Sequence, residues 1–239
     1  NFIMGHFGHS IINQQDIGQA LAERIPNTVI LVLPAYATSV VIATVHGLIG
    51  GRAPHSWAGR VIATVTAVGL ATPSFWIALL LIYFLGYAAN LFPLFGMGSA
   101  HQPLDVVWHM VLPYITLVVA YFPELARYVQ SKTIGEYQQD YVMVQRAFGA
   151  TERQILFHHV LPNVLLPIVT QIGQSLPLLV TGAMITETVF SWPGVGTYMM
   201  DASVKLDYPV ILAVMLLSAT LVVIGNLLAD VLYTVVDPR

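Results

Sequence analysis

The sequence predicts an all-α protein that folds as a polytopic transmembrane helical bundle. Only 9% of its 239 residues are charged and 56% are hydrophobic, whereas an ordinary soluble domain carries about 25% charged residues. The charged residues are also absent from five long runs of the sequence. So few charges cannot supply the polar shell that a soluble protein with five buried core helices would need. The bilayer is therefore the expected solvent for most of the chain.

The five charge-free runs are each near or above the roughly 18 apolar residues that indicate a transmembrane helix. They cover residues 25–51, 61–104, 106–123, 154–186 and 208–229. We therefore expect five spans in this sequence. Prolines within the runs predict bent helices, because a proline frees a backbone carbonyl that neighbouring helices must satisfy.

The basic residues between the runs indicate the orientation of the bundle. Seven fall on one face (Arg52, Arg60, Arg127, Lys132, Arg146, Arg153 and Arg239), and two fall on the other (Arg24 and Lys205). The positive-inside rule places the seven-residue face in the cytoplasm. The first run then begins outside. Because the sequence starts at Asn1 and not at a methionine, we expect a sixth span upstream of it.

The sequence divides into a short leading segment and one transmembrane domain. Residues 1–27 are expected to form an extracytoplasmic segment. Within it, apolar positions between residues 10 and 27 predict a surface helix that ends at Pro26. Residues 28–239 are expected to form the transmembrane domain. We see no internal repeat and no boundary of a second domain in the sequence.

The transmembrane domain includes a polar segment, residues 135–163, that is too long for a simple turn between two spans. Gly149 favours the end of one helix, because glycine tolerates the left-handed conformation, and Thr151 favours the start of another as its N-cap. The segment therefore predicts two short helices with a bend, exposed to the cytoplasm. From these residues alone, a docking surface and a simple connector are equally good interpretations.

Gly149, Leu161 and Pro162 have the spacing of a motif found in the inner-membrane permeases of ABC importers. That motif combines an EAA triplet, a glycine and a Leu-Pro pair, and residues 143–145 depart from the triplet. Five further blocks match the branch that carries dipeptides, oligopeptides and nickel: PSFW at 73–76, DYV at 140–142, ETVFSWPGVG at 187–196, DYPV at 207–210 and DPR at 237–239. The chain therefore resembles the permease subunits of this binding-protein-dependent, type I branch of importers.

The resemblance implies a type I permease fold with six helices, in agreement with the span expected upstream. It implies as partners a second homologous permease subunit, two ATP-binding subunits, an extracytoplasmic solute-binding protein and the lipid bilayer, with no nucleic acid. The residues that it implies for coupling to the ATPase are Asp140, Tyr141, Ala147, Gly149, Ala150, Glu152, Arg153, Leu161 and Pro162. An outer gate or a contact with the binding protein is expected at Glu187, Phe190, Trp192, Pro193 and Gly194. An interfacial aromatic anchor is the other interpretation of that second group.

The chain is expected to be a transport subunit and not an enzyme. It has no P-loop sequence, so ATP and Mg are expected on the partner ATPases and no cofactor on this chain. The resemblance implies peptide import by alternating access across the bacterial cytoplasmic membrane, with nickel or a metal chelate as the alternative solute. The eight histidines form no evident group within a span, so no metal site is expected. A stand-alone secondary transporter would need its own coupling-ion site, which we do not recognise.

Overall fold

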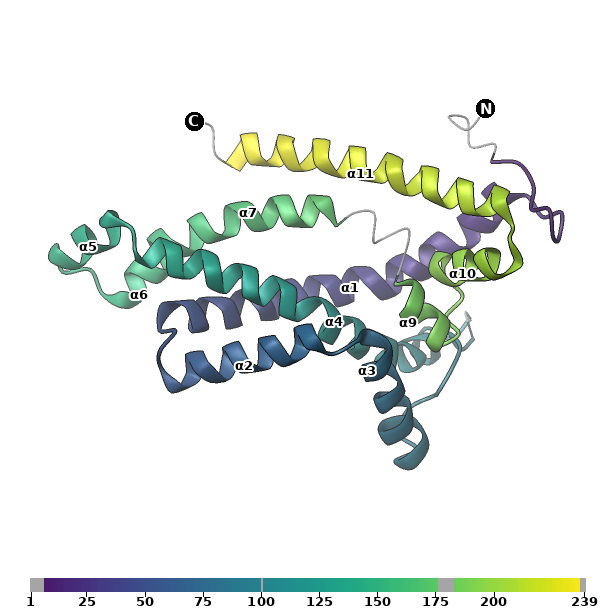
Figure 1. Ribbon diagram of the computed structural model, residues 1–239, viewed down its shortest axis with the longest axis horizontal. Helices are drawn as coiled ribbons and strands as arrows, with labels where there is room; N and C mark the ends of the chain where they lie inside the picture. Colours follow the sequence, from purple (N-terminus) through teal and green to yellow (C-terminus); the bar gives the residue numbers. More distant parts are fainter. Residues whose placement is uncertain (1–6, 100, 176–182, 237–239) are drawn as a thin grey trace. The chain divides into compact units, whose positions relative to one another are not determined.

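The computed structural model describes residues 7–99, 101–175 and 183–236, and these residues form helices joined by loops (Figure 1). The helices are α1 (Ile17–Arg52), α2 (Trp57–Ala71), α3 (Ser74–Leu81), α4 (Pro103–Tyr137), α5 (Asp140–Ala147), α6 (Glu152–Gln154), α7 (Leu161–Gln174), α9 (Met184–Val189), α10 (Val195–Lys205) and α11 (Tyr208–Val236), with π-helical segments η2 (Ile82–Ala88) and η3 (Ile155–Val160). The described residues contain no strand beyond an isolated bridge between His9 and Asp16. The predicted all-α fold is confirmed.

Several of these helices are long and apolar enough to cross a membrane. Three meet this test: α1, α4 and the part of α11 from residue 208 to residue 227. The broken pair made by α2 and by α3 with η2 adds a fourth candidate. The remaining expected span, residues 154–186, includes the 14 residues of α7. Its later part, residues 176–182, lies outside the described residues.

The run at residues 61–104 forms a broken helix and not a continuous one. Helix α2 ends at Ala71, and Thr72 takes an extended conformation with φ −96° and ψ 119°. Proline explains this break, because its ring disfavours the α conformation of the preceding residue and Pro73 has no N–H to continue the helical ladder. Pro73 then serves as the N-cap of α3.

The helix expected to end at Pro26 does not end there. Helix α1 begins at Ile17, after the side chain of Asp16 accepts a hydrogen bond of 2.9 Å from the backbone N–H of Gln19, and it continues through Pro26 and Pro34. The surface helix and the first span are therefore one element. Apolar side chains on both sides of Pro26 pack against neighbouring helices, which offsets the lost backbone hydrogen bond. The extracytoplasmic position of residues 1–27 stays a prediction.

The chain forms two compact units. The first comprises Asn1–Tyr36, Pro73–Val118 and Ser175–Gly225. Its main core joins the start of α1 to α10 and to the first turns of α11, through the buried residues Ile17, Leu21, Val195, Ala202, Val210, Ala213 and Val214. A smaller cluster joins α3, α4 and the end of α9 through Ala78, Leu112 and Phe190, the residue that follows α9. This packing positions the loop that precedes α10.

The second unit comprises Ala37–Thr72, Val119–Gln174 and Asn226–Arg239. Its core is formed by Leu48, Val129, Val142, Ile155, Val160, Val164 and Ile168. These residues come from α1, α4, α5, η3 and α7, so the short helices of segment 135–163 pack against the ends of long ones. The segment is therefore a folded part of the second unit.

Helices α1 and α4 approach each other closely within the second unit. A Cβ atom added at Gly47 would lie 2.5 Å from the Cβ of Val129, and one added at Gly51 would lie 2.5 Å from the Cβ of Thr133. Real Cβ atoms essentially never come so close to another side chain. Glycine at these two positions therefore sets the distance between the helices.

Replacing Gly47 by alanine should destabilise the protein by about 1–3 kcal/mol, because an extra methyl group in a well-packed contact forces the two helices apart. The measurement is thermal unfolding of the detergent-solubilised protein. Gly135→Ala on α4 is the matched control, because its added Cβ meets no atom within 4 Å. That control should keep or raise the melting temperature, since alanine is favoured over glycine in a helix by about 0.5–1 kcal/mol. Equal melting temperatures for Gly47→Ala and wild type would contradict the packing described.

Candidate functional site

The first candidate site is segment 135–163, which is anchored by its first short helix. The side chain of Val142 on α5 is fully buried in the core of the second unit. The hydroxyl of Tyr141 donates a hydrogen bond of 2.7 Å to the carboxylate of Glu136, which also accepts one of 3.1 Å from the amide of Asn163. Burial and this carboxylate raise the pKa of Tyr141 to about 12, so its hydroxyl remains a neutral donor. These contacts fix α5 against the end of α4 and the start of α7.

The bend between α5 and α6 has the geometry that Gly149 and Thr151 predict. Gly149 has φ +83°, in the left-handed region. Its N–H donates to the carbonyl of Arg146, and the N–H of Ala150 donates to the carbonyl of Gln145, both at 3.0 Å. This is the Schellman pattern, which satisfies the last carbonyls of a helix. It closes α5.

Helix α6 starts with a capping box at Thr151 and Gln154. The side chain of Thr151 accepts from the N–H of Gln154 at 3.3 Å, and the side-chain oxygen of Gln154 accepts from the N–H of Thr151 at 2.8 Å. The bend therefore has its own hydrogen bonds on both sides. The predicted bend and the short helix before it are confirmed. The second helix is not short, because α6 continues without a break through η3 into α7, so residues 152–174 form one helical run.

One carboxylate connects this bend to its surroundings. Glu152 accepts hydrogen bonds of 2.7 Å and 3.3 Å from the guanidinium of Arg146, and the guanidinium of Arg52 at the end of α1 lies 4.0 Å away. The hydrogen bond from Arg146 holds the pKa of Glu152 below its usual range. Because these side chains are half exposed, the ion pairs contribute only about 0–1 kcal/mol. They orient the bend more than they stabilise it.

The surface of the segment is apolar where it faces away from the bundle. The exposed fractions are 85% for Phe148, 71% for Met143 and 48% for Val144. Among the residues predicted for coupling, Asp140, Ala147, Gly149, Arg153 and Pro162 are also exposed, and Tyr141, Ala150, Glu152 and Leu161 are half-buried. Large apolar side chains exposed beside a polar rim are typical of protein interaction sites. The segment therefore exposes the apolar side chains that a docking surface needs, and its docking role stays a prediction.

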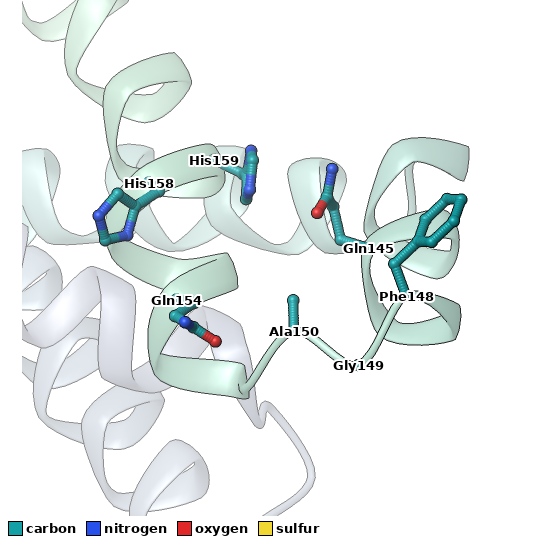
Figure 2. A pocket seen from close by; sticks show the side chains of 7 residues that line it. All are labelled: Gln145, Phe148, Gly149, Ala150, Gln154, His158 and His159. Carbon is teal, nitrogen blue, oxygen red and sulfur yellow. The ribbon is translucent and has the colours of Figure 1, made fainter.

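A pocket of about 440 Å³ opens beside the bend. Figure 2 shows the seven residues that line it: Gln145, Phe148, Gly149, Ala150, Gln154, His158 and His159. Two of them, Gly149 and Ala150, belong to the predicted coupling residues. The glutamines and histidines of the pocket were not predicted as site residues, because a polar side chain on a polar segment gives no local signal of its direction.

The second candidate site is a buried cluster in the first unit, centred on Glu187. The carboxylate of Glu187 is fully buried and accepts hydrogen bonds from the hydroxyl of Thr28 at 2.8 Å and from the N–H of Thr197 at 3.1 Å. The hydroxyl of Thr28 in turn accepts from the N–H of Val195 at 2.8 Å. The carboxylate therefore lies at the N-terminus of α10, where the helix dipole favours negative charge.

Trp192 adds a second connection between the same elements. Its indole N–H donates a hydrogen bond of 2.8 Å to the carbonyl of Asn27, and the amide of Asn27 donates one of 2.9 Å to the carbonyl of Pro193. Thr197 donates one of 2.7 Å to the carbonyl of Trp192. These bonds tie α1 to the loop before α10.

The five residues predicted as a gate or a binding-protein contact are therefore mostly interior. Glu187, Phe190, Trp192 and Gly194 are buried, and Pro193 is exposed. A partner bound to this face of the chain would contact Pro193 and the loop around it. The role of these five residues in gating or docking stays a prediction. Sequence reasoning missed Asn27 and Thr28, which lie more than 150 residues from Trp192 and Glu187 and carry no local sign of this pairing.

The described residues contain no group of three or more His, Asp or Glu side chains that could hold a metal ion. His6 lies outside the described residues. Two histidines of segment 135–163, the exposed His158 and the half-buried His159, line the pocket beside the bend.

Comparison with known proteins shows which protein family carries these two sites. Residues 39–239 match the family described as the binding-protein-dependent transport system inner membrane component. The chain belongs to this family. It is the membrane permease subunit of an ABC importer, a multi-pass membrane protein whose family is non-catalytic.

Relatives and solved structures agree with this family. The chain is 36% identical to the oligopeptide transport system permease protein AppB of Bacillus subtilis, over 100% of this chain and 77% of the relative. It is 35% identical to a probable peptide ABC transporter permease protein of Sinorhizobium fredii, over 99% of this chain and 76% of the relative. It is also 33% identical to SapB of Escherichia coli, named as a putrescine export system permease protein, over 97% of this chain and 80% of the relative.

A solved inward-facing structure of the MetNI methionine ABC transporter superposes on this permease with a TM-score of 0.71. The match covers 92% of this chain and 97% of the other chain, at 18% sequence identity. A likeness at this identity shows the fold alone. The predicted type I importer permease fold is therefore confirmed.

Replacing Glu187 by alanine should destabilise the permease strongly, because it leaves the hydroxyl of Thr28 and the N–H of Thr197 buried without their acceptor. Each buried donor left without an acceptor costs about 1–3 kcal/mol. Thermal unfolding in detergent should show a large fall in melting temperature. Glu23→Ala, which removes an exposed carboxylate from α1, should leave it nearly unchanged. A Glu187→Ala protein as stable as Glu23→Ala would show that the buried cluster does not stabilise the first unit.

Proposed function

We propose that this permease, together with a second homologous permease subunit, forms the path by which dipeptides or oligopeptides enter the cell by alternating access. Two partner ATPases supply the energy, and they bind ATP and Mg while this chain binds no cofactor. An extracytoplasmic solute-binding protein delivers the peptide. The observation that carries the proposal is the folded, apolar docking surface of segment 135–163 within a chain of the ABC permease family.

The docking surface supports coupling to an ATPase in two ways. Its outer side presents Phe148, Met143 and Val144, whose apolar side chains lose contact with water when a partner covers them. Its inner side is fixed by Val142 and Ile155 in the core of the second unit. A movement of the partner would therefore be transmitted to the ends of α1 and α4, because a well-packed core deforms little.

The outer site is proposed to act as a gate or a contact for the binding protein. The cluster around Glu187 and Trp192 holds the loop at residues 190–194 rigidly against α1. Pro193 then presents the exposed side of that loop. A rigid loop at the outer end of the path suits a gate that opens by movement of whole helices.

The names of two similar proteins support a peptide as the solute. The oligopeptide permease of Bacillus subtilis and the probable peptide permease of Sinorhizobium fredii both match nearly the whole chain. Nickel or a metal chelate remains the alternative solute from the sequence. In an importer of this design, the binding protein sets most of the selectivity.

Replacing Gly149 by aspartate should abolish coupling without preventing insertion into the membrane. A side chain at φ +83° costs roughly 1–2 kcal/mol of backbone strain, and the added carboxylate lies on the docking surface. The expected result is normal amounts of inserted permease with loss of solute-stimulated ATP hydrolysis and of uptake. Charge reversal by Arg153→Glu should have a milder effect, because exposed ion pairs contribute about 0–1 kcal/mol.

Gly96→Asp is the matched control for this experiment. Gly96 also has a positive φ, +86°, and no atom within 4 Å of an added Cβ, but it lies in a loop of the first unit. It carries the same strain and charge away from segment 135–163. Equal uptake per inserted complex for Gly149→Asp and wild type would remove Gly149 from the coupling mechanism and leave the segment as a connector.

Solute binding should be a property of the binding protein and not of the permease pair alone. The cognate binding protein is expected to bind peptides and not Ni²⁺ in a calorimetric screen of both. The purified permease pair, without that protein, should hold neither peptide nor Ni²⁺ at micromolar affinity, because its path is expected to be lined by apolar and small polar side chains. Binding of Ni²⁺ by the binding protein would replace the peptide proposal with the nickel alternative.

A further inference from the structure

We propose that the pocket beside Gly149 receives an aspartate or glutamate side chain from the ATPase subunit, so that the permease is a receptor as well as a ligand in this contact. The inference rests on the proposed function, in which segment 135–163 contacts the ATPase. It adds where on the permease one contact with the ATPase lies and which class of ATPase side chain makes it. On the permease, that contact is a pocket as well as the protruding side chain of Phe148.

The shape of the pocket allows a side chain to enter. Its volume of about 440 Å³ compares with roughly 30 Å³ for one water molecule in the liquid. The walls come from the end of α5, the bend, α6 and η3. In Figure 2, the side chains of Gln145, Ala150 and His159 border the space between α5 and η3, and Gln154 borders it from α6. The pocket therefore lies at the centre of the docking surface.

One polar group of the pocket, the side-chain amide of Gln154, has only hydrogen-bond donors left to offer. Its oxygen is occupied, because it accepts from the N–H and the hydroxyl of Thr151 at 2.8 Å and 2.9 Å. Its amide NH₂ therefore remains available. Gln145, His158 and His159 each carry at least one N–H to donate and one acceptor. Water satisfies these exposed or half-buried side chains in the free permease, so a partner group that displaces the water has to replace its hydrogen bonds.

Charge also favours an anionic partner group. None of the seven residues that line the pocket is acidic. The acid nearest in sequence, Glu152, already accepts two hydrogen bonds from Arg146. A carboxylate in the pocket would therefore meet several donors and no competing anion, while Phe148 and Ala150 contact its methylene stem. A lysine or arginine could not use Gln154 in this way, since the oxygen of Gln154 is taken, and no lining carboxylate would neutralise its charge.

Cysteine labelling tests whether the pocket is filled. The chain has no cysteine, so a single introduced thiol reports on one place. Ala150→Cys lies in the pocket, whereas Met143→Cys lies on the exposed face of α5 outside it. Both should react with N-ethylmaleimide in the permease pair without ATPase, and both should react at least tenfold more slowly in the complete importer.

The two labelling positions separate the two proposals. Protection of Met143→Cys without protection of Ala150→Cys would overturn the filled pocket and leave docking on the segment intact. Protection of neither position would overturn the docking proposal itself, and with it the pocket. Protection of both supports a partner group inside the pocket.

A charge substitution tests the chemistry of that group. Gln154→Glu keeps the acceptor of the capping box, because glutamate is also favoured at this position of a helix, and it places a carboxylate in the pocket. It should weaken binding of the ATPase subunit to the permease pair at least tenfold. Gln102→Glu adds the same charge at an exposed position outside segment 135–163 and should leave that affinity unchanged. Unchanged affinity for both Gln154→Glu and Gln145→Glu would overturn the assignment of an acidic side chain.

Discussion

The structure depends on one constraint, which is that backbone and buried polar groups must find hydrogen-bond partners, both where a bilayer excludes water and where a helix ends. Continuous helices meet this requirement by themselves. The polar side chains of the chain therefore gather at the ends of helices. Closure of α5 at Gly149, the capping box at Thr151 and the carboxylate of Glu187 below α10 are three solutions to the same problem. Both candidate sites lie at such interruptions because only there do polar groups have a structural reason to gather.

The docking segment combines a rigid inner side with an adaptable outer side. Its inner side shares one core with the ends of α1 and α4, and packed cores respond to force by moving as a whole. Its outer side carries exposed side chains such as Met143, which fill irregular partner surfaces well because methionine is flexible. This division lets one surface fit a partner while the helices behind it keep their geometry.

The features predictable from the sequence were those with a local cause. The bend at Gly149 and the cap at Thr151 follow from the backbone preferences of single residues, and the break at Pro73 follows from the proline that makes it. The end of a helix expected at Pro26 was wrong, because tertiary packing overrides the local cost of proline. The pairing of Thr28 with Glu187 joins residues 159 positions apart, and neither has a local preference that reveals the other.

The Glu187 cluster limits which residues the loop can carry at positions 194 and 196. The glycines at positions 194 and 196 face the carboxylate so closely that an added Cβ at either position would collide with its Oε2 atom. Exchanging the glutamate for a smaller residue would not make room for a side chain at these positions. A Cβ at position 194 would still lie 2.5 Å from the hydroxyl oxygen of Thr28, and one at position 196 would still lie 2.6 Å from the Cα of Met184. The same exchange would leave Thr28 and Thr197 without an acceptor. Both glycines are therefore required by the way the loop, α1 and α9 pack, and related chains that keep this packing should keep both.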